Sequence, residues 1–137
     1  MNITRPIVME IDLKNFHYNI NSIRNIIGKD ITIMPVVKEN AYGTHLNHRI
    51  DILNEFDIVA VATVDEGVFI RNLGYRKQIF VLNQPYEEEI EKILAYNIIV
   101  GISSYDFAEK LGATKEPVKV HLEIGTGMGR TGEHPYR

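Results

Sequence analysis

The sequence predicts an α/β fold in which helices cover a parallel β-sheet. Short apolar runs recur at nearly even spacing, and amphipathic helical patterns lie between them. Largely continuous apolar runs are typical of parallel strands covered on both faces, and their alternation with helices indicates βα units. Five such units fit either a (β/α)8 barrel or a doubly wound sheet. The runs are residues 31–37, 58–62, 78–82, 98–102 and 118–124.

The first 28 residues predict a lead-in strand and a helix. Residues 7–11 read as the strand, and the Asp12 carboxylate can cap the helix that follows. Gly28 stands where a left-handed helix stop is expected. The helix is predicted from one apolar stripe at three- and four-residue steps, which consists of Leu13, Phe16, Ile20, Ile23 and Ile27.

Three later helices have recognisable start signals. Thr63 and Glu66 fit a capping box, and residues 87–95 begin with acidic side chains, which the helix dipole favours. Ser104 can cap the third helix. Pro35 is awkward inside the run 31–37, because it cannot donate a ladder hydrogen bond, and a bulge is expected there.

Composition excludes several classes of protein. The formal charge of −3 and pI near 5.9 argue against a nucleic-acid or polybasic membrane partner. The absence of cysteine excludes disulfides and thiol catalysis, and the histidines lack metal-ligand spacing, so no metal site is expected. Residues 1–10 do not resemble a signal peptide, and no apolar stretch approaches the roughly 20 residues of a membrane span. We therefore expect a cytoplasmic protein. The lack of a glycine-rich phosphate loop disfavours a nucleotide-binding sheet.

Lys38 is the first candidate functional residue. It ends the apolar run 31–37 and is followed by ENAYG (39–43). In a parallel barrel the carboxyl ends of the strands form the mouth of the active site. A lysine there has a packed base and an amine that faces the cavity, as a Schiff-base lysine requires. The alternative is a surface lysine that simply ends a strand, and spacing alone favours this alternative.

A second candidate site lies in VKVHLEIGTGMGRTG (118–132), where apolar residues alternate with Lys119, His121 and Glu123. One face of this strand is expected to pack against helices while the other carries polar groups. In a barrel Glu123 would point inward, where a buried carboxylate needs a partner, and Arg130 is the obvious one. The alternative is an ordinary flexible loop with an edge salt bridge.

Taken together, VVKENAYG (36–43) and GTGMGRTG (125–132) resemble the motifs of the alanine racemase family of fold-type III pyridoxal-phosphate enzymes. The segment VMEIDLKNFHYNI (8–20), VAT (61–63) with Glu66, and FVL (80–82) match the family as well. The resemblance runs from about Arg5 to Gly132. It implies that residues 1–137 are the N-terminal part of the family's pyridoxal-phosphate-binding (β/α)8 barrel.

The resemblance also implies roles for single residues. Lys38 matches the lysine that binds the cofactor as a Schiff base and then acts as one of two acid/base groups. Tyr42 matches a tyrosine that hydrogen-bonds the cofactor phosphate, Arg130 an arginine that contacts its phenolic oxygen, and Leu82 an apolar contact near its ring. Family members often have a carbamate-modified lysine at the position of Glu123, which supplies a negative charge without modification.

The implied activity is the interconversion of L- and D-alanine, supplying D-alanine for cell-wall synthesis, by a homodimer that acts on a small amino acid. The family's second base is a tyrosine from the C-terminal half of the other subunit, and no residue here matches it. A barrel takes about 250 residues, so the rest of the barrel and a C-terminal β domain are expected outside residues 1–137, which alone are expected to be inactive. The alternatives are a racemase for another amino acid such as serine, a pyridoxal-phosphate-binding barrel without racemase activity, and a non-catalytic remnant.

Overall fold

A computed structural model of the chain describes residues 7–129 and 131–133, which belong to two compact units, Met1–Ile33 and Met34–Arg137. The first unit contains α1 (Leu13–Ile27), and its predicted cap is confirmed. Asp12 accepts hydrogen bonds from the backbone N–H groups of Lys14 (2.8 Å) and Asn15 (3.1 Å), and Gly28 ends the helix with φ 88°. The predicted strand at residues 7–11 is wrong, because these residues have no strand partner among those described.

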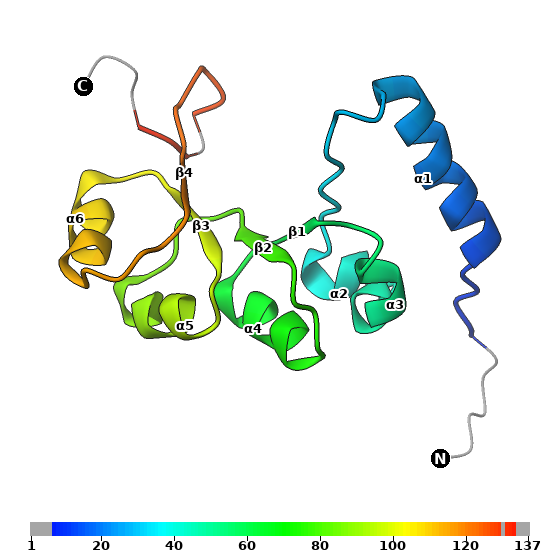
Figure 1. The fold of residues 1–137 in the computed structure, drawn as a ribbon, viewed down its shortest axis with the longest axis horizontal. Helices are drawn as coiled ribbons and strands as arrows, with labels where there is room; N and C mark the ends of the chain where they lie inside the picture. The colour runs from blue at the N-terminus through cyan, green and yellow to red at the C-terminus, as the bar shows by residue number, and fades with distance from the viewer. Residues whose placement is uncertain (1–6, 130, 134–137) are drawn as a thin grey trace. The chain divides into compact units, whose positions relative to one another are not determined.

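The second unit contains a four-stranded parallel sheet in the order β1-β2-β3-β4 (Figure 1). Each crossover therefore leads to the adjacent strand, as in a barrel, whereas a doubly wound sheet reverses its order at a switch point. The fold is α/β, and its sheet has the strand order of a (β/α)8 barrel. In chain order the elements are α2 (Lys38–Tyr42), the 3-10 helix η1 (Leu46–His48), α3 (Ile50–Leu53), β1 (Ile58–Val61), α4 (Val64–Asn72), β2 (Gln78–Val81), the 3-10 helix η2 (Glu87–Glu89), α5 (Ile90–Ala95), β3 (Ile99–Ile102), α6 (Tyr105–Ala113) and β4 (Val120–Leu122).

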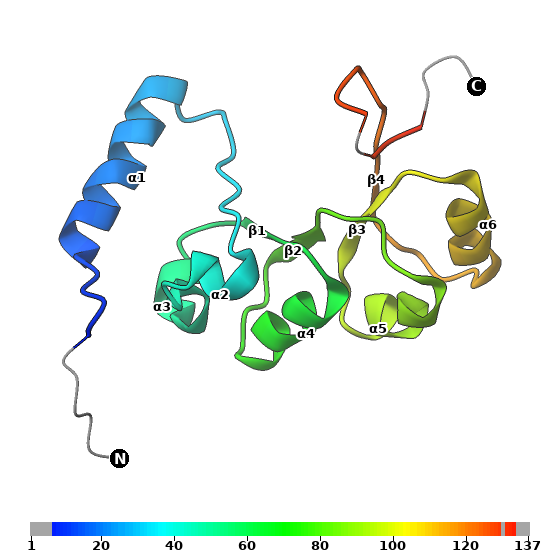
Figure 2. The ribbon, with the colours of Figure 1, turned by 180° about the vertical axis from the view of Figure 1, so that it is seen from behind.

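Helices α4, α5 and α6 lie on the same side of the strands, as both ribbon views show (Figure 2). The main core lies between this side of the sheet and the helices. The predicted capping box of Thr63 and Glu66 begins α4 and the predicted cap Ser104 begins α6, whereas the helix predicted at residues 87–95 is η2 followed by α5, and α5 has no side-chain cap. Burial of these aliphatic and aromatic side chains provides the main stabilisation of the unit. The fully or almost fully buried core residues include Val59, Val61, Val64, Ile70, Ile79, Val81, Ile93, Val100, Phe107 and Leu111.

Strand β4 differs from its prediction in one respect. Its apolar residues Val120 and Leu122 were expected to pack against helices, yet their exposed fractions are 42% and 68%. The preceding helix, α6, packs against β3 instead, and no helix among the described residues covers β4. None of the helices in the described part of the chain is both long and apolar enough to cross a membrane.

The predicted strand at residues 31–37 is much shorter than expected. Its pairing with β1 is a single bridge between Val36 and Ala60 with two hydrogen bonds, from Ala60 N–H to Pro35 O and from Val37 N–H to Ala60 O, both 2.8 Å. In a parallel ladder the preceding bond would run from the nitrogen of residue 35 to the carbonyl of Ile58. Proline has no N–H, so pairing begins at its carbonyl, without the expected bulge.

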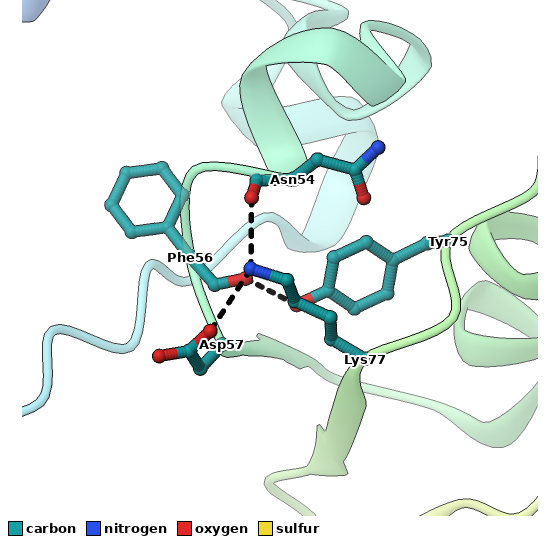
Figure 3. Close-up of polar contacts among 5 residues, drawn as sticks. All are labelled: Asn54, Phe56, Asp57, Tyr75 and Lys77. Atoms are coloured by element: carbon teal, nitrogen blue, oxygen red, sulfur yellow. Dashed lines mark hydrogen bonds and ion pairs between the residues drawn. The ribbon is translucent and has the colours of Figure 1, made fainter.

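The amino-terminal ends of β1 and β2 are joined by polar contacts (Figure 3). Tyr75 is fully buried, and its hydroxyl donates to the carbonyl of Phe56 (3.0 Å). Lys77 Nζ donates to the Asn54 carbonyl and to Asp57 Oδ1, both at 2.9 Å. These bonds lie at the opposite end of the strands from Lys38, so they stabilise the sheet without entering the candidate site.

Candidate active site

The face of the sheet away from the helices carries a small apolar cluster that forms the floor of the candidate site. Ala60, Phe80 and Ile99 are buried there. The ring of His121 lies against Phe80, with 4.3 Å between the ring centroids and 31° between the planes. In a closed barrel this face would be the interior, and His121 lies on the predicted polar face of its strand. Four partly buried residues pack around the cluster, namely Met34, Val36, Ile58 and Leu82.

Lys38 lies next to this cluster in the chain, just after the segment that pairs with β1. Val36 pairs with Ala60, and Lys38 follows two residues further on. Val37 has ψ 21° and already leaves the extended conformation, so Lys38 begins α2 at the carboxyl end of this segment, and it is half-buried. The register of the ladders, continued by one residue, places four positions at the next level of this face, which are Ala62, Leu82, Gly101 and His121.

Two of these four positions, Ala62 and Gly101, carry almost no side chain. A Cβ atom built on Gly101 would still meet only ordinary contacts, the nearest being Leu82 O at 3.5 Å. These two residues therefore add little side-chain volume to this face, where the ring of His121 lies against Phe80.

The chain turns sharply after Lys38, because α2 is one turn of left-handed helix. Glu39, Asn40 and Ala41 have φ of 52–53° and ψ of 44–52°, and Tyr42 has φ 55°. The left-handed conformation costs roughly 1–2 kcal/mol per non-glycine residue. Backbone strain of this kind persists only where surrounding contacts hold it, and it is concentrated at functional sites. The sequence contains no signal for it, since Glu, Ala and Tyr all disfavour positive φ.

Tyr42 lies at the end of this turn with 63% of its surface exposed. The structure thus places Lys38, Leu82 and Glu123 just beyond the carboxyl ends of their strand segments, with Tyr42 in the turn that follows Lys38. In the part of the chain that the structure describes, no hydrogen bond joins these four side chains to one another.

Glu123 follows β4 and faces a closed loop. The loop is pinned by a bridge between Ile124 and Glu133, and Thr131 Oγ1 donates a short hydrogen bond to Glu123 Oε1. The other carboxylate oxygen, Oε2, is buried and has no partner among the described residues. Arg130, its predicted partner, lies outside those residues. A buried carboxylate oxygen without a donor is costly, so this position suits a cation or a hydrogen-bond donor.

The loop itself requires glycine at one end. A Cβ atom on Gly132, which has φ 99°, would lie 2.6 Å from the nitrogen of Gly125, well inside contact distance. The glycine-rich pattern therefore closes the loop on itself below Glu123. The glycines thus allow close approach of backbone to backbone within the loop.

A separate pocket of about 380 Å³ lies beside the left-handed turn. Neither Lys38 nor Tyr42 lines it. Within it the ring of His48 makes edge contacts with those of His45 (5.4 Å) and Phe69 (5.0 Å), which supports the structural role expected for the histidines. Its lining residues are Asn40, His45, Asn47, His48, Thr63, Asp65, Glu66 and Phe69. The described residues contain no group of three or more His, Asp or Glu side chains placed to hold a metal ion.

Comparison with known proteins identifies the family. Residues 11–137 match the sequence model of the family described as "Alanine racemase, N-terminal domain". The chain belongs to the alanine racemase family. It is 37% identical over 139 residues to an alanine racemase of Halothermothrix orenii, and 36% identical over 131 residues to an amino-acid racemase of Enterococcus faecalis.

A solved structure of alanine racemase from Clostridium difficile 630 has the same fold, with a TM-score of 0.88 at 32% identity. The match covers 98% of this chain and 39% of the racemase. The alignment with the Halothermothrix orenii racemase covers 97% of this chain and 37% of that protein. The alignment with the Enterococcus faecalis racemase covers 92% of this chain and 18% of that protein. The chain thus spans well under half the length of these racemases, and it corresponds to their barrel domain's N-terminal portion.

Proposed function

We propose that the protein carrying this chain is a pyridoxal-phosphate-dependent racemase that interconverts L- and D-alanine, with Lys38 as the residue that binds the cofactor. The observation that carries the proposal is the placement of Lys38. It directly follows the segment that pairs with β1, at the carboxyl end of that segment and within the motif VVKENAYG (36–43), and it is half-buried. When bound, the cofactor supplies an electron sink that lowers the cost of removing the α-proton of an amino acid.

The side chains of this chain have distinct tasks in the proposal. Lys38 Nζ anchors the cofactor and moves a proton at one face of the substrate α-carbon. Leu82 would give the ring an apolar contact, and Tyr42 would donate its hydroxyl to the phosphate. Arg130 would donate to the phenolic oxygen with Glu123 as its negatively charged partner, and Glu123 Oε2 has no partner among the described residues. Inversion needs a second base on the opposite face, which we assign to another subunit of a homodimer.

The substrate we propose is a small amino acid, with alanine as the first choice because two of the compared proteins are named alanine racemase. Supply of D-alanine for cell-wall synthesis would be the physiological role. The Enterococcus faecalis relative is named an amino-acid racemase, so a racemase for another amino acid, such as serine, is the second candidate. Rates with L-alanine and L-serine at equal concentration separate the two.

The test is to trap the cofactor on its lysine. The intact protein is incubated with pyridoxal phosphate, reduced with borohydride and digested, and the pyridoxyl group is mapped by mass spectrometry. We expect it on Lys38, and we expect Lys38→Ala to lose both the label and the formation of D-alanine. Lys119→Ala is the matched control, because Lys119 lies on the same face two residues before His121. Label on a lysine other than Lys38 refutes the assignment, and label on Lys38 without racemisation favours a cofactor-binding protein that is not a racemase.

A further inference from the structure

Glu66 connects the backbone next to Lys38 with the end of β1. Its Oε1 accepts a hydrogen bond from the backbone N–H of Glu39 (2.7 Å). Its Oε2 accepts bonds from the N–H groups of Ala62 (2.8 Å) and Thr63 (3.3 Å). One carboxylate on the first turn of α4 therefore holds three backbone donors from two segments.

The register shows what these bonds replace. The pairing of residues 35–37 with β1 has hydrogen bonds from Ala60 N–H to Pro35 O and from Val37 N–H to Ala60 O. In a parallel ladder the next two bonds would run from Ala62 N–H to Val37 O and from Glu39 N–H to Ala62 O. Neither forms. Both donors turn to Glu66 instead, and Val37 O accepts from Ala41 N–H (3.0 Å) inside the left-handed turn.

The carboxylate thus ends strand pairing at Lys38. It satisfies the two donors that the interrupted ladder would leave without partners, and it frees Val37 O for the turn. Without it, residue 39 would either continue the ladder in an extended conformation or leave a backbone donor unpaired. The peptide between Lys38 and Glu39 has one fixed orientation because its N–H is held from a helix 27 residues away.

We propose that Glu66 is a positioning residue for Lys38. By holding the Glu39 N–H, it fixes the direction in which Lys38 leaves the strand and the start of the left-handed turn that carries Tyr42. This goes beyond its role in the capping box of α4, which requires only the bond to the Thr63 N–H. The inference rests on the proposed function only for the consequence that cofactor attachment depends on Glu66.

The chemistry of the site requires a carboxylate of this length. All three contacts are donors, so both oxygens must accept. Glu66→Gln turns one acceptor into an NH₂ donor, which faces either Glu39 N–H or the pair at Ala62 and Thr63. Glu66→Asp keeps the charge at the N-terminus of α4 but is one methylene shorter, so that it cannot reach both segments.

The chain offers two matched controls. Glu89 makes the corresponding bond to the N–H of Tyr86 (2.8 Å) at η2, so Glu89→Gln is the same substitution in the same type of cap away from Lys38. Thr63→Ala removes the hydroxyl that accepts from the Glu66 N–H (3.3 Å) and weakens the same helix cap without touching the bond to Glu39.

The experiment has two readouts in the intact protein. The first is hydrogen exchange of the Glu39 amide without cofactor, which should become roughly tenfold or more faster in Glu66→Gln and Glu66→Asp, since a lost hydrogen bond to a charged group is worth at least that factor. The second is the rate at which pyridoxal phosphate becomes trappable on Lys38 and the resulting kcat, which should fall roughly 10- to 100-fold with little change in KM. Both controls should stay within about twofold of the wild type in both readouts.

The outcomes separate the two proposals. If the Glu39 amide exchanges equally fast in wild type and in Glu66→Gln, the inference is wrong. It is also wrong if Thr63→Ala slows attachment as much as Glu66→Gln does, because capping alone would then explain the effect. If wild-type protein never carries the label on Lys38, the proposed function fails, while faster exchange at Glu39 in the two variants still supports the positioning of the Lys38 backbone.

Discussion

Replacing Arg71 should destabilise the sheet at the end opposite the candidate site. Arg71 lies on α4, and its guanidinium donates to four backbone carbonyls at 2.8–3.1 Å, which come from the segments leading into β2 and β3. Burial is the main reason that the pKa of Arg71 is lowered from its ordinary value. In Arg71→Met the hydrocarbon stem remains, but three of the four carbonyls lose the guanidinium as donor and Tyr75 O keeps only the 3.5 Å bond from Arg76 Nη1. The four carbonyls are Tyr75 O, Lys77 O, Tyr96 O and Asn97 O.

The magnitude follows from how many of these carbonyls can recover water. The bonds to Lys77 O and Asn97 O are exposed, whereas those to Tyr75 O and Tyr96 O are part-buried. Two part-buried bonds to a charged donor, at roughly 1.5 kcal/mol each, give a loss of about 3 kcal/mol. For a domain of this size that corresponds to a fall in Tm of roughly 6–12 °C.

The assay is thermal and urea unfolding of the intact protein, with Arg49→Met as the matched control. Arg49 pairs with Asp51 at 2.6 Å, but their side chains are 48% and 63% exposed, so its loss should leave the unfolding midpoint almost unchanged. Trapping of the cofactor on Lys38 should be unchanged in Arg71→Met at temperatures where the variant is folded. If Arg71→Met has the same unfolding midpoint as Arg49→Met, the reasoning from the four bonds is wrong.

Two further predictions concern Tyr75 and Glu123. Burial raises the pKa of Tyr75 to about 12, so its contribution to stability is complete below the unfolded value near 10 and is lost between pH 10 and pH 12. The free energy of unfolding should therefore fall less steeply over this interval in Tyr75→Phe than in wild type, and parallel curves would contradict the assignment. Glu123→Gln should weaken the hold on Arg130 by roughly 1.5–3 kcal/mol and shift the absorption spectrum of the bound cofactor. An unchanged spectrum together with full activity would show that the pair has no role.

Local signals in the sequence predicted the helices well. The caps at Asp12, Thr63 and Ser104 each bind an N–H within three residues, so the residues that make the bond are visible together in the sequence. Apolar runs located β1 to β4 within two residues or so at each end. The runs did not reveal which face was which, because parallel strands are apolar on both sides. Only the polar alternation of His121 and Glu123 indicated a direction.

Pairing was predicted less well than the elements themselves. Residues 7–11 and 31–37 have strand-like composition, but a strand also needs a partner that presents free donors and acceptors. The first segment has none among the described residues, and the second is limited to two hydrogen bonds. Composition reports how well a segment fits a sheet, whereas the number of bonds it makes depends on neighbours that are distant in the sequence.

The environment of Lys38 depends both on a local sequence signal and on a contact between residues that are distant in the sequence. Pro35 limits the pairing on one side, and this limit could be read from the sequence, since proline lacks the donor that the ladder requires. Glu66 ends the pairing on the other side, through a bond to Glu39 that spans 27 residues and that a capping-box pattern does not predict. Between Pro35 and the bond to Glu66, the segment that precedes Lys38 pairs with β1 through only two backbone hydrogen bonds. The orientation of Lys38 therefore depends on a side chain from α4 more than on the β-ladder, and a substitution at Glu66 should disturb the candidate site while leaving β1 to β4 paired.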